Sequence, residues 1–139
     1  MPRGAYLQER IPGAAGSIVF AADGRRAVPL GLTRQLVGER AFGARGFRYC
    51  GSLLASSDEV LFPRQPELLD GATALAQAAT AGFGLRGLNG IDFIARNGVP
   101  LPIEVNPRYC ASMELVEHTA HSAQHFRQDG LFIEDCNRD

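Results

Sequence analysis

Two short turn signals, Asp23-Gly24 and Asn97-Gly98, constrain the fold of this 139-residue chain more than any other feature. Each pair lies between stretches rich in apolar and β-branched residues, and Asp-Gly and Asn-Gly favour the tight turns of β-hairpins. The sequence therefore predicts one hairpin over residues 17–33 and another over residues 88–105. Hairpin strands are antiparallel neighbours, so the expected sheet is antiparallel.

Two other segments have the spacing of helices. In residues 66–82 apolar side chains recur three and four positions apart, with Pro66 suited to the first turn and Gly82 to the end. A second helix is predicted over about 111–127, beginning near Ser112. Hairpins combined with two helices predict an α+β fold, an antiparallel β-sheet with flanking helices.

The remaining segments are assigned from composition. Residues 34–46 are rich in arginine and glycine and are expected to form a mobile loop, whereas residues 47–55 are expected to form a strand. We interpret residues 1–127 as one partial domain and residues 128–139 as a C-terminal tail.

Charge and composition exclude several classes of function. The net charge is −1, so no basic field favours nucleic acid or an anionic membrane. No apolar run approaches the roughly 20 residues of a membrane span. All fourteen basic residues are arginine, which excludes a Walker A loop because that loop needs a lysine. The three cysteines have no CxxC spacing, so we expect reduced thiols and a cytoplasmic protein.

Polar residues interrupt the last predicted strand. Glu104 and Asn106 alternate with Ile103 and Val105, so the polar pair shares one face of the strand. The preceding strand carries another acid, Asp92. These residues are either the solvated face of an edge strand or oxygen ligands held on a rigid support.

The length of the hairpin turn decides whether Asp92 faces Glu104. A two-residue turn at Asn97-Gly98 puts Asp92 opposite Ile103, on the wrong face. A loop of three or five residues puts Asp92 opposite Glu104. A shared site therefore predicts a loop with an odd number of residues.

The two prolines of the last strand bear on the same pairing. Pro100 and Pro102 have no N–H group, so neither can occupy a hydrogen-bonded pair. Glu104 has the same parity and is predicted to face Asp92 in a non-hydrogen-bonded pair, where Cα atoms approach to about 4.5 Å. Two carboxylates at that separation can share a cation.

Two carboxylates and an amide oxygen form a ligand set that suits Mg²⁺ or Mn²⁺ better than zinc. Asp92, Glu104 and Asn106 are the candidate metal ligands. Arg108 follows closely and could donate a planar pair of N–H groups to a phosphate or carboxylate.

Two stretches resemble the ATP-grasp superfamily. "GIDFIARNGVPLPIEVNPRYCAS" (90–112) is similar to its metal-binding segment, and "YLQERIPG" (6–13) is similar to the hinge that holds adenine. The resemblance covers about residues 5–127 and implies the C-terminal half of an ATP-grasp fold, as in ATP-dependent carboxylate–amine ligases.

The resemblance also implies roles for individual residues. Asp92, Glu104 and Asn106 would bind Mg²⁺ (or Mn²⁺) between the ATP phosphates, and Arg108 would be a catalytic contact to a phosphate or acyl phosphate. Ligases of this family activate a carboxylate as an acyl phosphate, which an amine or thiol attacks. The adenine side of the site would be formed by Gln8, Glu9, Arg10 and Ile11.

Two departures from the family pattern leave alternatives open. The chain has no lysine and lacks the lobe that carries lysines over the phosphates, and Ala14 and Ala15 occupy positions where an acid usually binds ribose. The chain is therefore interpreted as part of a ligase for an unidentified small carboxylate. The alternative is a remnant that binds nucleotide or metal without independent catalysis, completed by a partner chain or a homo-oligomer. A purely structural α+β domain is a third interpretation.

Overall fold

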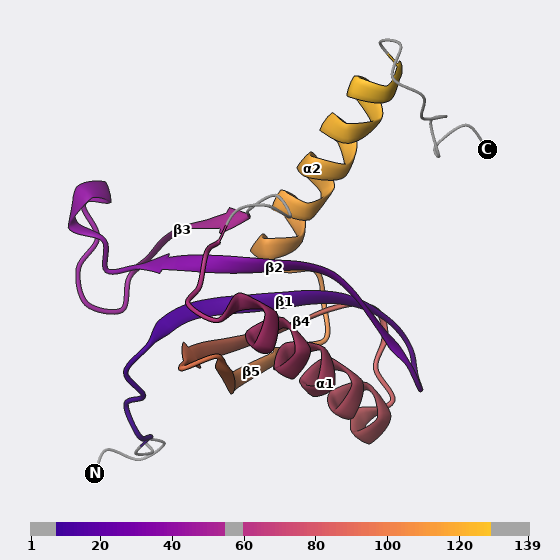
Figure 1. Ribbon diagram of the computed structural model, residues 1–139, viewed down its shortest axis with the longest axis horizontal. Helices are drawn as coiled ribbons and strands as arrows, with labels where there is room; N and C mark the ends of the chain where they lie inside the picture. Colours follow the sequence, from indigo (N-terminus) through magenta and orange to yellow (C-terminus); the bar gives the residue numbers. More distant parts are fainter. Residues whose placement is uncertain (1–7, 55–59, 129–139) are drawn as a thin grey trace.

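The computed structural model describes residues 8–54 and 60–128, with side chains described as far as residue 119. Within these residues the chain forms one five-stranded antiparallel sheet and two α-helices, the α+β fold that was predicted (Figure 1). The order of strands across the sheet is β3-β2-β1-β4-β5. Along the chain the elements are β1 (Ala14–Asp23), β2 (Ala27–Val37), a 3₁₀ turn (Arg40–Phe42), β3 (Tyr49–Leu54), α1 (Gln65–Phe83), β4 (Arg86–Arg96), β5 (Val99–Asn106) and α2 (Ala111–Gln128).

Both predicted hairpins are confirmed, and their turn residues explain them. The Asp23 carboxylate accepts hydrogen bonds from the backbone N–H groups of Arg25 and Arg26, at 2.8 and 2.7 Å, and so closes the β1–β2 turn. Asn97 and Gly98 have φ values of 53° and 79°. Two successive residues with positive φ are what a two-residue hairpin turn of type I′ requires, and Asn-Gly adopts them at low cost.

The two helices lie on opposite faces of the sheet. Ile18 and Phe20 of β1 are fully buried on the face that α1 covers, in one apolar core with Phe93 of β4. Ser17 and its cross-strand partner Thr33 point to the other face, because successive strand residues alternate. There the Thr33 hydroxyl donates to the Ser112 hydroxyl of α2 at 3.2 Å. Figure 1 shows α1 lying along the sheet and α2 projecting away from it.

Two details of the predicted elements are wrong. The expected loop at 34–46 begins too early, because β2 continues to Val37 and pairs with β3. The first predicted helix runs one residue further, to Phe83: Gly82 lies within it, and Gly84 caps it with φ 63° and an N–H bonded to the Thr80 carbonyl. Glycine tolerates this left-handed conformation at a helix end.

The second predicted helix is confirmed, and it includes Gln128, the first residue of the predicted tail. The other residues of that tail lie outside the described part of the chain.

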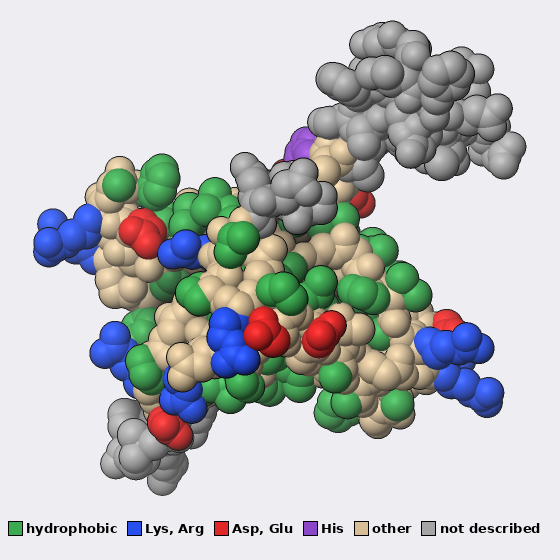
Figure 2. Space-filling view, viewed as in Figure 1, with side chains coloured by type: hydrophobic (Ala, Val, Ile, Leu, Met, Phe, Trp, Pro, Cys, Tyr) green, Lys and Arg blue, Asp and Glu red, His purple; other side chains and the backbone are tan. Residues whose placement is uncertain are grey.

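No described helix combines the length and apolar character needed to cross a membrane. On the face in Figure 2, arginine side chains occur in several separate groups, with hydrophobic side chains spread between them.

Candidate functional site

A β-bulge in β5 brings two acidic residues opposite one another. Phe93 pairs with Pro102 and Asp92 pairs with Glu104, which leaves Ile103 as an extra residue in β5. The turn before it has two residues, so the predicted odd-length loop is wrong. The predicted pairing of Asp92 with Glu104 is nevertheless present, and the bulge produces it.

The bulge also reverses which face Glu104 occupies. Without the extra residue, Glu104 would lie opposite Ile91, which is 1% exposed in the core beneath α1. Burying a carboxylate there would be costly, and the bulge places the apolar Val105 opposite Ile91 instead. Glu104 therefore does not share a face with Pro102, and the predicted common parity is wrong.

Both carboxylate oxygens of Asp92 accept a hydrogen bond. Gln35 Nε2 donates to Oδ1 at 3.0 Å, and Asn106 Nδ2 donates to Oδ2 at 3.3 Å. Gln35 was missed from the sequence because it was placed in the expected loop. Its position two residues after Thr33, on the same face of β2, is the signal that could have found it.

The predicted metal ligands and Arg108 lie around one cavity of about 350 Å³, here called the acidic cavity. Four strands and the start of α2 contribute to it. Arg108 is exposed at its wall, where Nη1 donates to the Tyr109 carbonyl at 3.2 Å. The lining residues are Gln35, Tyr49, Asp92, Glu104, Asn106, Arg108, Cys110, Ala111 and Ser112.

The oxygen ligands available in the acidic cavity suit a hard divalent cation. Asp92 and Glu104 face each other directly, and like charges so placed destabilise a sheet unless a cation lies between them. The Asn106 nitrogen is occupied by Asp92, so its amide oxygen is the atom left for a cation. Among the described residues no group of three or more His, Cys, Asp or Glu could hold a metal. A set of two carboxylates and an amide leaves positions for water or phosphate, which is typical of Mg²⁺.

Burial raises the pKa of Asp92 above its usual 3.8, and the Glu104 carboxylate adds to the rise. The Ser17 hydroxyl and the amides of Gln35 and Asn106 oppose it. A raised pKa means that the fold favours the protonated form. The resulting stabilisation is present below pH 3.8 and is lost as the pH rises through the pKa of the folded protein.

The Asp92→Asn variant of the metal-free protein is therefore expected to be more stable than the wild type at pH 7. The gain should be below about 1 kcal/mol, because solvent screens a half-buried carboxylate, and it should shrink toward pH 3. Urea denaturation at several pH values measures both. Asp70→Asn, on the exposed surface of α1, controls for the loss of one negative charge. A gain that grows toward low pH would contradict the prediction.

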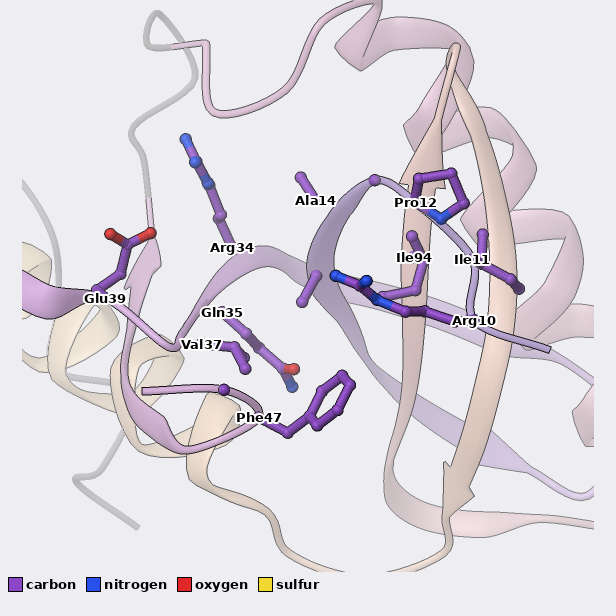
Figure 3. A pocket seen from close by; sticks show the side chains of 13 residues that line it. Arg10, Ile11, Pro12, Ala14, Arg34, Gln35, Val37, Glu39, Phe47 and Ile94 are labelled. Carbon is purple, nitrogen blue, oxygen red and sulfur yellow. The ribbon is translucent and has the colours of Figure 1, made fainter. Parts of the chain in front are cut away.

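A second cavity, of about 290 Å³ and here called the hinge cavity, lies beside the segment before β1 (Figure 3). Arg10 and Ile11, two of the four predicted adenine-side residues, line it. Gln8 and Glu9 are exposed and do not line it.

The far side of the hinge cavity comes from β2 and the loop that follows it. In Figure 3 the Gln35 and Phe47 side chains extend toward the space beside Arg10, whereas Arg34 points away. Gln35 also lines the acidic cavity, so one side chain belongs to both walls. The geometry therefore joins Asp92, Glu104, Asn106 and Arg108 at one cavity, with Arg10 and Ile11 at the next.

Comparison with known protein families matches residues 3–112 to the ATP-grasp domain. Similar solved structures include an ATP-grasp superfamily protein from Archaeoglobus fulgidus (TM-score 0.58, 24% identity, covering 81% of this chain and 32% of that one). The biotin carboxylase domain of a single-chain bacterial carboxylase is similar at TM-score 0.58 and 20% identity (84% and 25% covered). D-alanine–D-alanine ligase from Bacillus anthracis is similar at TM-score 0.52 and 15% identity (87% and 38% covered). At these identities the likeness shows the fold alone, and the chain spans less than two fifths of each structure. No curated protein sequence matches the chain.

Proposed function

Because this chain belongs to the ATP-grasp family, we propose that it forms part of an ATP- and Mg²⁺-dependent ligase. Such a ligase activates a small carboxylate as an acyl phosphate, which an amine or thiol then attacks. One observation carries the proposal: Asp92 and Glu104 lie opposite each other, with the Asn106 amide beside them, in the cavity that Arg108 also lines.

Each residue has a proposed role that follows from its chemistry. Asp92, Glu104 and Asn106 would hold the cation through oxygen atoms. Mg²⁺, when bound, supplies positive charge that balances the phosphate oxygens. Arg108 is exposed at the cavity wall, where its planar guanidinium can donate two hydrogen bonds to a phosphate or acyl phosphate. In phosphoryl transfer such positioning and charge stabilisation supply most of the catalysis.

The hinge cavity is the proposed site of the adenine. The apolar side chains of Ile11 and Phe47 can pack against a planar base, and Arg10 adds a donor. Gln8 and Glu9 would contribute from the adjoining segment rather than from the cavity wall. The proposed domain is residues 1–127, a part of the complete ATP-grasp fold.

A nucleotide- and metal-binding module without independent catalysis is the second candidate. It is favoured by the absence of lysine from this sequence. Under this proposal a partner chain or a second copy would complete the catalytic site.

Calorimetric titration of the full chain with ATP tests the proposed cation site. Binding is expected to require Mg²⁺, and Glu104→Gln is expected to weaken it by at least about tenfold, because one of two charged ligands is lost. Glu67→Gln, on the exposed surface of α1, should bind as the wild type does.

The outcomes separate the two candidates. Release of ADP in the presence of carboxylates and amines would support a ligase, whereas binding without turnover would support the module. ATP binding that is indifferent to Mg²⁺ and to Glu104 would contradict the proposed site.

A further inference from the structure

Among the described residues, Gln35 alone lines both of the cavities defined above. Its Nε2 atom donates to Asp92 Oδ1 at 3.0 Å, although 57 residues separate the two in the sequence. A polar side chain in the wall between two cavities can respond to what occupies either of them.

The sheet explains how Gln35 reaches Asp92. Gln35 lies on β2 and Asp92 on β4, with β1 between them. The β1 residue opposite Asp92 is Ser17, which is fully buried and small. The carboxylate is thus held from one side by Gln35 and from the other by Asn106, on the edge strand β5.

We propose that Gln35 is a positioning residue that fixes the Asp92 carboxylate for cation binding and couples the hinge cavity to the acidic cavity. The inference rests on the proposed function, because it takes Asp92 to be a cation ligand. A partner that orients a ligating carboxylate raises metal affinity without touching the metal. A base in the hinge cavity that shifts the Gln35 carboxamide would change its hydrogen bond to Asp92. The affinity of Asp92 for the cation would change with it.

The first test measures Mn²⁺ affinity by the electron paramagnetic resonance of free Mn²⁺, without nucleotide. Gln35→Met keeps the length of the side chain but removes the donor, and it is expected to weaken Mn²⁺ binding by about 10–100-fold. Gln77→Met is the matched control. Gln77 donates to the Arg25 carbonyl at 2.6 Å and accepts from Ala27 N–H at 3.1 Å, away from both cavities. Its loss should leave Mn²⁺ affinity unchanged.

The second test uses adenosine, which can enter the hinge cavity but carries no phosphate to bind the cation. Any coupling between adenosine and Mn²⁺ must then pass through the protein. Adenosine is expected to change the Mn²⁺ Kd of the wild type by at least about threefold, with the reciprocal effect on adenosine affinity that linkage requires. In Gln35→Met the change should disappear.

The outcomes separate a failure of this inference from a failure of the proposed function. A wild type that binds no Mn²⁺ would overturn both. Wild-type binding with an undiminished affinity in Gln35→Met would overturn the positioning role alone, and an Mn²⁺ Kd indifferent to adenosine would overturn the coupling.

If Gln35→Met fails to fold, nuclear magnetic resonance of the wild type replaces it. The side-chain amide protons of Gln35 should shift on addition of Mg²⁺ and again on addition of adenosine. Amide signals that respond to neither addition would overturn the inference.

Discussion

Phe93→Ala is expected to lower the free energy of unfolding by about 3–5 kcal/mol, the usual cost of deleting a buried aromatic ring. Phe93 is 1% exposed, and its ring centroid lies 6.2 Å from that of Phe62. A Cβ placed on Gly16 would approach both rings to 2.8 Å, so the backbone of β1 is packed directly against them. The cavity left by alanine therefore has rigid walls that cannot readily collapse into it.

Urea denaturation followed by circular dichroism measures this loss. Phe83→Ala is the matched control, because Phe83 is 75% exposed at the end of α1 and its truncation should change stability by less than about 0.5 kcal/mol. Equal losses in the two variants would show that the core is not centred on Phe93.

Two single-residue deletions in β5 are expected to have opposite effects on the candidate site. Deleting Val105 would place Asn106 opposite Ile91, on the buried face beneath α1. The amide would then be buried without a partner and an apolar contact would be lost, at a combined cost of at least about 3 kcal/mol. Asn106 would also leave the acidic cavity, so Mn²⁺ binding should be lost.

Deleting Ile103 removes only the extra residue of the bulge. The strand can then pair regularly, with Pro102 opposite Phe93 and Glu104 still opposite Asp92. Ile103 is 44% exposed, so the expected cost is about 1 kcal/mol and Mn²⁺ binding should persist. Denaturation and Mn²⁺ titration of both variants check the pair of results. Binding lost on deletion of Ile103 but kept on deletion of Val105 would contradict the bulge.

The hairpins were predictable because their causes are local. Asp23 bonds its own turn, and Asn97 and Gly98 tolerate positive φ, so a few neighbouring residues decide the structure. The pairing of Asp92 with Glu104 was also expected, but its cause was not. A bulge at Ile103 depends on which face of β5 meets α1, and that is a property of the packed molecule.

Gln35 was missed in the sequence for a related reason. The arginine and glycine residues around it resemble a loop, yet β2 continues to Val37 because β3 pairs with it. Tertiary pairing overrides local preference in such strands. Its partner Asp92 lies two strands away, and no spacing in the sequence points to a contact over that distance.

The two edges of the sheet differ in how readily they could recruit another chain. An exposed edge strand is a template for self-association, and proline and bulges are the features that block added strands. β5 carries both, with Pro100 and Pro102 lacking N–H groups and Ile103 breaking the regular ladder. β3, at the other edge, also has a bulge, at Cys50, but it has no proline within Tyr49–Leu54. The edge that supports Glu104 and Asn106 is thus the better protected of the two, because its prolines remove backbone donors that an added strand would need.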